Sequence, residues 1–244
     1  MLEQLKTQVC RANLDLVNEG RVVQTWGNVS GIDRDKGLVV IKPSGVYYSH
    51  MQPRHMVVVA LDSGKVVEGK LNPSSDTPTH LVLYRAFASI GGVVHTQSLF
   101  ATAWGQAKRA PPYGTTQADY WYGEVPCTRP LTPEEIRDDY EANTGRVIVE
   151  TFREEGLDRR QHPAMLVACH GPFTWGKDAA DAAHKAVALE FIARLVTETL
   201  RINPRANPMS SMLLDKHFLR KHGPSAYYGQ PAPGQHSRTG KTNH

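Results

Sequence analysis

The sequence predicts a single α/β domain, and three observations support that expectation. Short runs rich in valine and isoleucine alternate with segments whose apolar residues recur at helical spacing, without a regular βαβ repeat. Neither an internal repeat nor a separate second core is evident in the 244 residues, of which 40% are hydrophobic. From about Gln230 the composition turns to Pro, Gly, Ser, Thr and Asn. We therefore expect a folded domain over residues 1–230 and a disordered tail over 231–244.

In the first half of the chain the apolar pattern switches between runs typical of strands and the spacing typical of helices. Short β-like runs are expected at residues 37–42, 56–61, 65–68 and 92–96. Asp62-Ser63-Gly64 predicts a hairpin turn before the third of these runs. Helical spacing predicts helices over residues 2–19, 77–89 and 99–107, and Gly20 provides a natural stop for the first.

The second half of the chain is expected to be mostly helical. Thr132, Pro133 and Glu135 form a capping-box pattern that predicts a helix start, and Gly145 could interrupt that helix. A further β-run covers residues 164–169. An alanine-rich helix over 179–200 and a last helix over 210–221 complete the expected elements.

Charge and composition exclude several classes of protein. The net charge is +4, from 28 basic and 24 acidic residues that are well mixed, whereas nucleic-acid-binding proteins concentrate their basic residues. No apolar run approaches the roughly 20 residues that span a bilayer, and the N-terminus does not resemble a signal peptide. The three cysteines are far apart, which suits reduced thiols. We expect a cytoplasmic enzyme with neither a nucleic acid nor a membrane partner.

Two histidines and one aspartate could hold a metal ion. Alternation along a strand places His95 and Gln97 on one face, and His170 follows the β-run 164–169. Asp76 lies beside two serines, before a helix. Asp76, His95 and His170 would form a two-histidine, one-carboxylate set with open positions for substrate or water. A buried, hydrogen-bonded structural role for each histidine is the alternative, and spacing alone does not decide between them.

Three turns rich in small and hydroxyl residues could bind a phosphate group. They cover residues 25–30 (TWGNVS), 42–45 (KPSG) and 73–76 (PSSD). Such turns present backbone N–H groups and hydroxyls, and Lys42 adds a positive charge. The third turn also opens a helix, whose dipole favours an anion. Any one of these turns, taken alone, is more often an ordinary turn or helix cap, and three of them beside a possible metal site are more suggestive.

Two further residues could transfer protons. Asp119 lies in the segment GTTQADY, and Tyr228 in AYYGQ. A carboxylate can act as a general acid or base, and a tyrosine hydroxyl can donate to a developing oxyanion. Read alone, Asp119 is a turn residue and Tyr228 a packing tyrosine.

Taken together, these segments resemble a known family. The chain carries, in order, TWGNVS, VIKPSG, PSSDTPTH, GGVVHT, GTTxADY, YGxxPCTR, HGPFxWG, LLDKHxLRKHG and AYYGQ. This series is similar to that of the L-ribulose-5-phosphate 4-epimerases, a group within the class II aldolase/adducin family. The resemblance implies an α/β/α fold with a mixed, largely antiparallel central sheet. It also implies a homotetramer with sites at subunit interfaces, and conversion of L-ribulose 5-phosphate to D-xylulose 5-phosphate in L-arabinose breakdown.

The resemblance also implies roles for individual residues. Positions matching substrate or phosphate binding are Gly27, Asn28, Lys42, Ser44, Gly45, Ser74 and Ser75, and His217 matches a residue that lines the site. Asp76, His95 and His170 match ligands of a divalent zinc ion. Asp119 and Tyr228 match an acid/base pair that the neighbouring subunit supplies. The implied mechanism is retro-aldol cleavage and re-formation of the C3–C4 bond.

The chain departs from the family pattern at two positions. The family motif His-Thr-His is His95-Thr96-Gln97 here, and Gln117 stands where GTTHADY has histidine. Gln97 is thus a weak candidate ligand or leaves its position to water, which would favour a harder ion such as Mn²⁺. Alternatively, specificity has moved to another sugar phosphate handled by a related aldolase or epimerase. In the third interpretation the chain is a binding module or scaffold without catalysis, as adducin's domain is.

Overall fold

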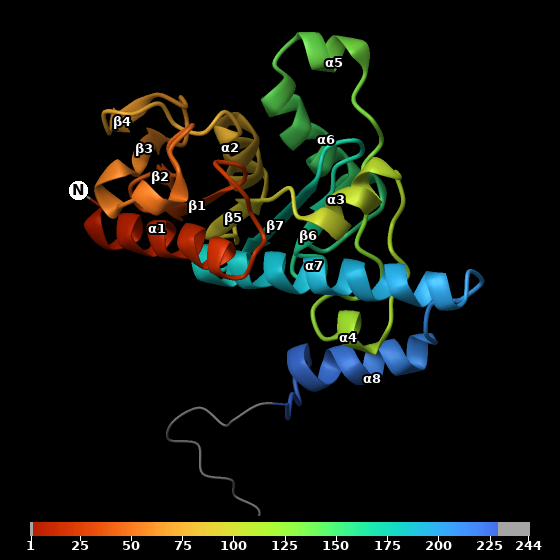
Figure 1. Cartoon of the computed structure of the whole chain (residues 1–244). Helices are drawn as coiled ribbons and strands as arrows, with labels where there is room; N and C mark the ends of the chain where they lie inside the picture. Colours follow the sequence, from red (N-terminus) through yellow and green to blue (C-terminus); the bar gives the residue numbers. More distant parts are fainter. Residues whose placement is uncertain (1, 229–244) are drawn as a thin grey trace, which may run out of the picture.

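The computed structural model describes residues 2–228, so the tail expected at 231–244 lies outside the described residues (Figure 1). The α-helices are α1 (Glu3–Asn18), α2 (Thr77–Ala86), α3 (Leu99–Gln106), α4 (Thr115–Ala118), α5 (Pro133–Arg137), α6 (Tyr140–Glu154), α7 (Ala179–Ile202) and α8 (Ser211–His222). The strands are β1 (Asn28–Asp33), β2 (Leu38–Ile41), β3 (Val57–Ala60), β4 (Val66–Glu68), β5 (Gly92–His95), β6 (Ala164–Leu166) and β7 (Pro172–Gly176). Two 3-10 turns are η1 (Tyr48–His50) and η2 (Pro53–His55).

The strands form one sheet in the order β4-β3-β2-β1-β5-β7-β6. All neighbouring strands pair antiparallel, and an isolated bridge between Cys127 and Leu166 is parallel. The largely antiparallel sheet expected from the sequence is therefore confirmed. In the neighbouring strands β1, β5 and β7, Asn28 pairs with His95, and His95 pairs with Phe173. This register brings the start of β1, the end of β5 and the start of β7 to the same end of the sheet.

Helices cover both faces of the sheet, as Figure 1 shows. Val40 and Val94 pack with α1 and α7 on one face, whereas Val39 and Val93 pack with α2 and α6 on the other. Adjacent residues of a strand point to opposite faces, so each central strand contributes to both cores. The α/β/α sandwich is therefore confirmed.

The sequence pattern did not predict two of the strands. Residues 25–30 were expected to be a polar turn, but Asn28 already begins β1. Gly171 and Pro172 were expected to bend the chain, and β7 begins at Pro172 itself. β1 and β7 flank β5, so both missed strands lie inside the sheet and neither is an edge strand.

The helical region after Thr132 is divided, but not where the sequence suggested. The predicted capping box forms, because the Thr132 N–H donates to the Glu135 carboxylate at 2.8 Å and the Glu135 N–H donates to the Thr132 hydroxyl at 3.3 Å. The break expected at Gly145 is wrong. The chain breaks at Asp139, which has a left-handed φ of 72°. Gly145 lies within α6, where a Cβ would come 3.0 Å from the Thr79 carbonyl oxygen. Glycine here allows α6 to pack closely on α2.

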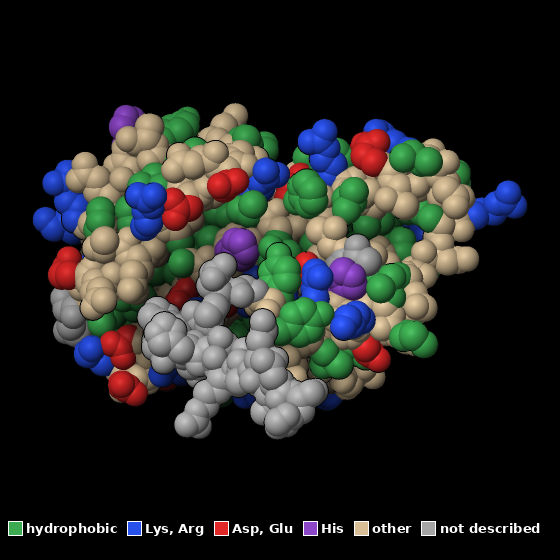
Figure 2. Space-filling view, turned by 90° about the horizontal axis from the view of Figure 1, so that it is seen from below, with side chains coloured by type: hydrophobic (Ala, Val, Ile, Leu, Met, Phe, Trp, Pro, Cys, Tyr) green, Lys and Arg blue, Asp and Glu red, His purple; other side chains and the backbone are tan. Residues whose placement is uncertain are grey.

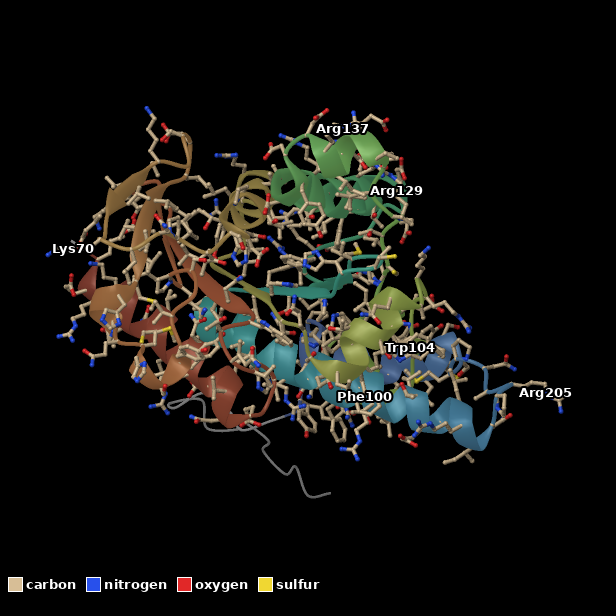
Figure 3. The ribbon with its side chains drawn as sticks, turned by 45° about the horizontal axis from the view of Figure 1, so that its top comes forward. Lys70, Phe100, Trp104, Arg129, Arg137 and Arg205 are labelled. Atoms are coloured by element: carbon tan, nitrogen blue, oxygen red, sulfur yellow. The ribbon has the colours of Figure 1, made fainter. Side chains whose placement is uncertain are left out.

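A third apolar cluster lies between α3 and α7. Trp104 of α3, labelled with Phe100 in Figure 3, packs on α7 and its Nε1 lies 3.0 Å from the Thr197 hydroxyl. In Figure 1, α4 and α8 lie on the opposite side of α7 from α2, α5 and α6. No helix within residues 2–228 is long and apolar enough to cross a membrane.

Candidate active site

Three potential metal ligands meet at the end of the sheet where the start of β1, the end of β5 and the start of β7 lie together. Asp76 immediately precedes α2, His95 ends β5, and His170 lies in the hairpin between β6 and β7. One ligand atom from each side chain can be chosen so that all three lie within 4.8 Å of one another. The fold thus brings together residues that are up to 94 positions apart, from 76 to 170.

The carboxylate of Asp76 does not cap the helix that follows it. Asp76 occupies the N-cap position of α2 but makes no side-chain capping bond. Instead the Asn28 amide donates to Asp76 Oδ2 at 2.6 Å and to the Ser74 hydroxyl at 2.9 Å. Burial raises the pKa of this carboxyl. His95, His80 and the Asn28 hydrogen bond together lower it by more, so the pKa lies below its ordinary value. Asp76 is therefore an anion available to a cation.

The imidazole of His95 is fixed in one orientation. Its Nδ1 lies 3.0 Å from the Pro172 carbonyl oxygen, and its ring stacks on Phe173 with centroids 4.4 Å apart. A carbonyl can only accept, so Nδ1 carries a proton, and in the neutral imidazole the lone pair is then on Nε2. This arrangement, in which one ring nitrogen donates to the backbone, is typical of metal-binding histidines.

A tight hairpin presents His170. Cys169 has a left-handed φ of 61°, a conformation that costs a residue other than glycine about 1 kcal/mol or more. The Cys169 N–H donates to the Gly105 carbonyl oxygen at 3.0 Å, which helps to hold the turn. Gly171 approaches the neighbouring strand so closely that a Cβ would lie 3.0 Å from the Thr96 carbonyl oxygen. The hairpin can therefore bring His170 beside His95, with ring centroids 4.7 Å apart.

The protonation state of His170 suits a metal ligand. Burial and the neighbouring His95 lower its pKa to about 4, so the imidazole is neutral near pH 7. Metal ligation requires a neutral imidazole. Tyr140, which the sequence did not single out, places its hydroxyl 3.3 Å from His170 Nδ1 and stacks loosely on the ring. No motif around Tyr140 signals this contact.

Gln97, at the third position of the family's His-Thr-His motif, has a different environment. Gln97 lies two residues beyond the end of β5 with an exposed side chain, and it makes no hydrogen bond to any of residues 2–228. Among the described residues, Asp76, His95 and His170 therefore form the candidate donor set. A carboxylate with two imidazoles fits a divalent ion and leaves positions open for substrate oxygens.

The three polar turns predicted from the sequence converge beside this cluster. The Ser44 N–H donates to the Asn72 carbonyl oxygen at 2.9 Å, and the Ser74 N–H donates to the Lys42 carbonyl oxygen at 3.0 Å. Asn28, from the first turn, reaches Ser74 in the third. Ser75 and Gly45 lie exposed on the same turns. Gly27 has a φ of 72°, and a Cβ there would lie 3.0 Å from the His95 carbonyl oxygen.

Lys42 is an unusual lysine because it is only 2% exposed. Its Nζ donates to the Thr25 carbonyl oxygen at 2.9 Å and lies 4.9 Å from the ring centroid of Tyr48. Burial lowers its pKa to about 8, while Asp76 opposes the shift. The ammonium is thus mostly charged at pH 7, and a nearby phosphate would favour its charged form.

Asp119, Tyr228 and His217 lie apart from the cluster. Asp119 follows α4, whereas His217 is on α8 and its Nδ1 lies 3.7 Å from Asp119 Oδ1. Within residues 2–228, no hydrogen bond, ion pair or ring contact joins Asp119, His217 or Tyr228 to Asp76, His95 or His170. Figure 2 views the side of α4 and α8, where basic and histidine side chains lie among exposed hydrophobic ones.

Gln117 has a structural role in the loop that carries Asp119. Its side chain is 1% exposed, and Nε2 donates to the Gly123 carbonyl oxygen at 2.9 Å. Its backbone carbonyl accepts the N–H groups of Tyr120 and Trp121. A glutamine amide therefore braces this loop at the position where the family motif has histidine.

Comparison with known proteins extends the geometric description. The sequence profile described as Class II Aldolase and Adducin N-terminal domain matches residues 7–197. L-ribulose-5-phosphate 4-epimerase UlaF of Salmonella paratyphi B is 56% identical over 230 residues, which cover 94% of this chain and 100% of that protein. The protein of the same name from Salmonella typhi matches with the same identity and coverage.

Two solved structures share the fold. An L-fuculose 1-phosphate aldolase superposes with a TM-score of 0.74 at 21% identity, covering 89% of this chain and 95% of that one. The L-fuculose-1-phosphate aldolase of Thermus thermophilus gives a TM-score of 0.64 at 23% identity, covering 84% and 100%. At these identities the likeness establishes the architecture alone.

Proposed function

Because the chain belongs to the class II aldolase and adducin family, we propose that it is an L-ribulose-5-phosphate 4-epimerase. It would interconvert L-ribulose 5-phosphate and D-xylulose 5-phosphate. The observation that carries this proposal is the 56% identity, over the full length of the relatives, to proteins of that name. The cluster of Asp76, His95 and His170 beside three phosphate-type turns supports it.

The chemistry of the substrate defines what the site must do. Carbon 4 bears a hydroxyl group but no acidic hydrogen, so simple deprotonation at carbon cannot invert it. Removing the hydroxyl proton lets the C3–C4 bond break, which leaves a three-carbon enediolate and glycolaldehyde phosphate. Rotation of the aldehyde and re-formation of the bond on its other face, with protonation of the C4 oxygen, gives the epimer. The site therefore needs proton-transfer groups on opposite faces and stabilisation of negative charge.

The phosphate turns would hold the aldehyde fragment while its bond to C3 is broken. Lys42 supplies a buried ammonium, and the Asn28 amide lies between the turns and Asp76. The remaining positions proposed for this anchor are Gly27, Ser44, Gly45, Ser74 and Ser75. An anchored phosphate allows the aldehyde to rotate but not to escape, which favours epimerisation over net cleavage.

The cluster would hold a divalent ion, which we propose to be Zn²⁺ or, given Gln97, the harder Mn²⁺. Such an ion would act as a Lewis acid toward the negative charge on the substrate oxygens. The free Nε2 of His95, the neutral His170 and the anionic Asp76 support this assignment.

We propose a homotetramer in which Asp119, Tyr228 and His217 reach the cluster of a neighbouring subunit. Asp119 follows α4 and His217 is on α8, two helices that lie beyond α7 in Figure 1. The lack of a contact to the cluster within residues 2–228 supports an intersubunit site. Asp119 and Tyr228 would then exchange protons with the C4 oxygen on opposite faces. Operation in L-arabinose breakdown and in the cytoplasm stays a prediction.

A coupled assay for D-xylulose 5-phosphate on purified protein, with metal analysis of the same sample, tests the proposed function. We expect bound divalent metal and measurable epimerisation. Accumulation of free aldehyde and ketone fragments would instead identify an aldolase. Protein that stays inactive after addition of Zn²⁺ or Mn²⁺ would support the binding-module alternative.

The Gln97→His variant should bind metal about tenfold more tightly, because imidazole is a stronger ligand than an amide oxygen. Competition with a chromophoric chelator would measure this affinity in the wild type and the variant. Gln8→His is a matched control, because Gln8 is an exposed glutamine on α1. Unchanged affinity and unchanged rate in Gln97→His would show that position 97 does not reach the metal.

A further inference from the structure

Arg220 joins the two acid/base candidates, although the sequence did not single it out for such a role. Its Nη2 donates to both carboxylate oxygens of Asp119, at 2.8 and 3.0 Å, and its Nε donates to Oδ1 at 3.2 Å. The guanidinium carbon also lies 4.8 Å from the ring centroid of Tyr228. One side chain therefore contacts both Asp119 and Tyr228.

The pair between Arg220 and Asp119 is shielded more than a typical surface ion pair. The two side chains are 24% and 16% exposed. A guanidinium that meets a carboxylate at several points fixes its orientation as well as its charge. Lys221 adds an ammonium group 3.5 Å from Asp119 Oδ2 and 4.6 Å from the Tyr228 ring centroid. Lys221 contributes charge, whereas Arg220 also contributes geometry.

The backbone of Arg220 has a separate role. Its carbonyl oxygen accepts the N–H groups of Tyr227 at 3.0 Å and Tyr228 at 3.1 Å, which folds the chain back over the end of α8. The Tyr122 hydroxyl donates to Asp215 and helps to dock α8. Neither interaction uses the Arg220 side chain. Truncating that side chain should therefore leave the backbone of this segment in place.

We propose that Arg220 is a positioning residue that holds Asp119 and Tyr228 together as one preassembled acid/base unit. This inference rests on the proposed function, because it assigns a task within that reaction. A free aspartate side chain rotates about two bonds, and the fork from Arg220 removes that freedom before substrate arrives. The contacts of Arg220 with Asp119 and Tyr228 exist within a single chain. The acid/base unit would therefore form before it meets the metal-ligand cluster of the neighbouring subunit.

Truncation in Arg220→Ala should lower kcat about 100-fold and leave KM within about threefold, because a misplaced catalytic group costs rate without removing substrate contacts. Arg220→Lys, which keeps the charge but not the fork, should recover part of the loss. Lys221→Met should cost less than Arg220→Ala. Arg129→Ala is the matched control: Arg129 also forks carboxylates, Glu135 and Glu150, beside α5 and α6 (Figure 3). It should leave kcat unchanged.

Two measurements separate positioning from a loss of structure. Millimolar guanidinium should restore activity to Arg220→Ala but not to Asp119→Asn, whereas ammonium should restore little. The loss of kcat in the double variant Asp119→Asn/Arg220→Ala should be smaller than the product of the two single losses, because Arg220 acts in large part through Asp119. Additive losses, a KM increase in place of a kcat loss, or wild-type kcat in Arg220→Ala would each overturn the inference.

The wild-type enzyme distinguishes failure of this inference from failure of the proposed function. An inactive wild type would reject the function. An active wild type with an impaired Asp119→Asn but an unimpaired Arg220→Ala would reject the positioning role alone.

Discussion

Asparagine in place of His95 is expected to remove the bound divalent metal and to lower kcat/KM about 1000-fold. Within residues 2–228 the cluster offers three strong donors, and Gln97 is exposed beyond the end of β5. Loss of one imidazole would leave a carboxylate and one histidine, too few for a stable site. A Lewis acid contributes about 4 kcal/mol to such a reaction, which corresponds to this rate factor. Metal content by mass spectrometry and the coupled epimerase assay would measure both effects.

A second variant and a control separate metal loss from unfolding. His95 is 2% exposed and stacks on Phe173, so its replacement could also loosen the core. His170 lies in a hairpin instead of a strand, so His170→Asn should lose the metal and keep the thermal midpoint of the metal-free wild type. His50→Asn alters an exposed histidine of η1 and should keep the metal and the activity. Full metal content in both His95→Asn and His170→Asn would contradict the assignment of the site.

Much of the fold follows from the sequence because apolar periodicity reports burial. The valine runs of β2, β3 and β5 each contribute to both cores, and their alternation is visible without a structure. β1 was missed because its sequence, NVSGID, is mostly polar or small, and its pairing with β2 and β5 comes from the tertiary context. β7 starts at a proline, which is normally a breaking signal. Gly145 was wrongly interpreted as a possible helix break, because a glycine is required there by the close packing of α6 on α2.

Which residues form the candidate site was more predictable than how they are arranged. Residue types alone suggested Asp76, His95 and His170 as ligands, but the register that aligns β1, β5 and β7 brings Asn28 against Asp76. Tyr140 carries no sequence signal, and Arg220 stands in a family motif that assigns it no role. Their partners lie 30 and 101 positions away along the chain. Orienting contacts of this kind depend on tertiary packing, which local patterns do not encode.

Asparagine in place of Asp119 is expected to lower kcat about 1000-fold while the metal stays bound. General acid/base groups contribute about 100- to 10,000-fold to a rate, and asparagine keeps the shape of the side chain but cannot accept a proton. Arg220 and the backbone would still hold the segment, so KM should change little. Asp215→Asn is the matched control on α8, because Asp215 accepts from Tyr122 and has no proposed proton-transfer role. Wild-type kcat in Asp119→Asn would remove Asp119 from the mechanism.

Mixed oligomers would then show which chain supplies Asp119. Co-expressed His95→Asn and Asp119→Asn chains are each expected to be inactive alone. If sites form between subunits, an intact cluster from one chain meets an intact Asp119 from the other at one site in four. The mixture should then recover about a quarter of wild-type activity. If both groups acted in the same chain, every site would carry one defect and the mixture would stay inactive. Because α7 lies between β5, which ends at His95, and α4, which precedes Asp119, in Figure 1, we expect recovery.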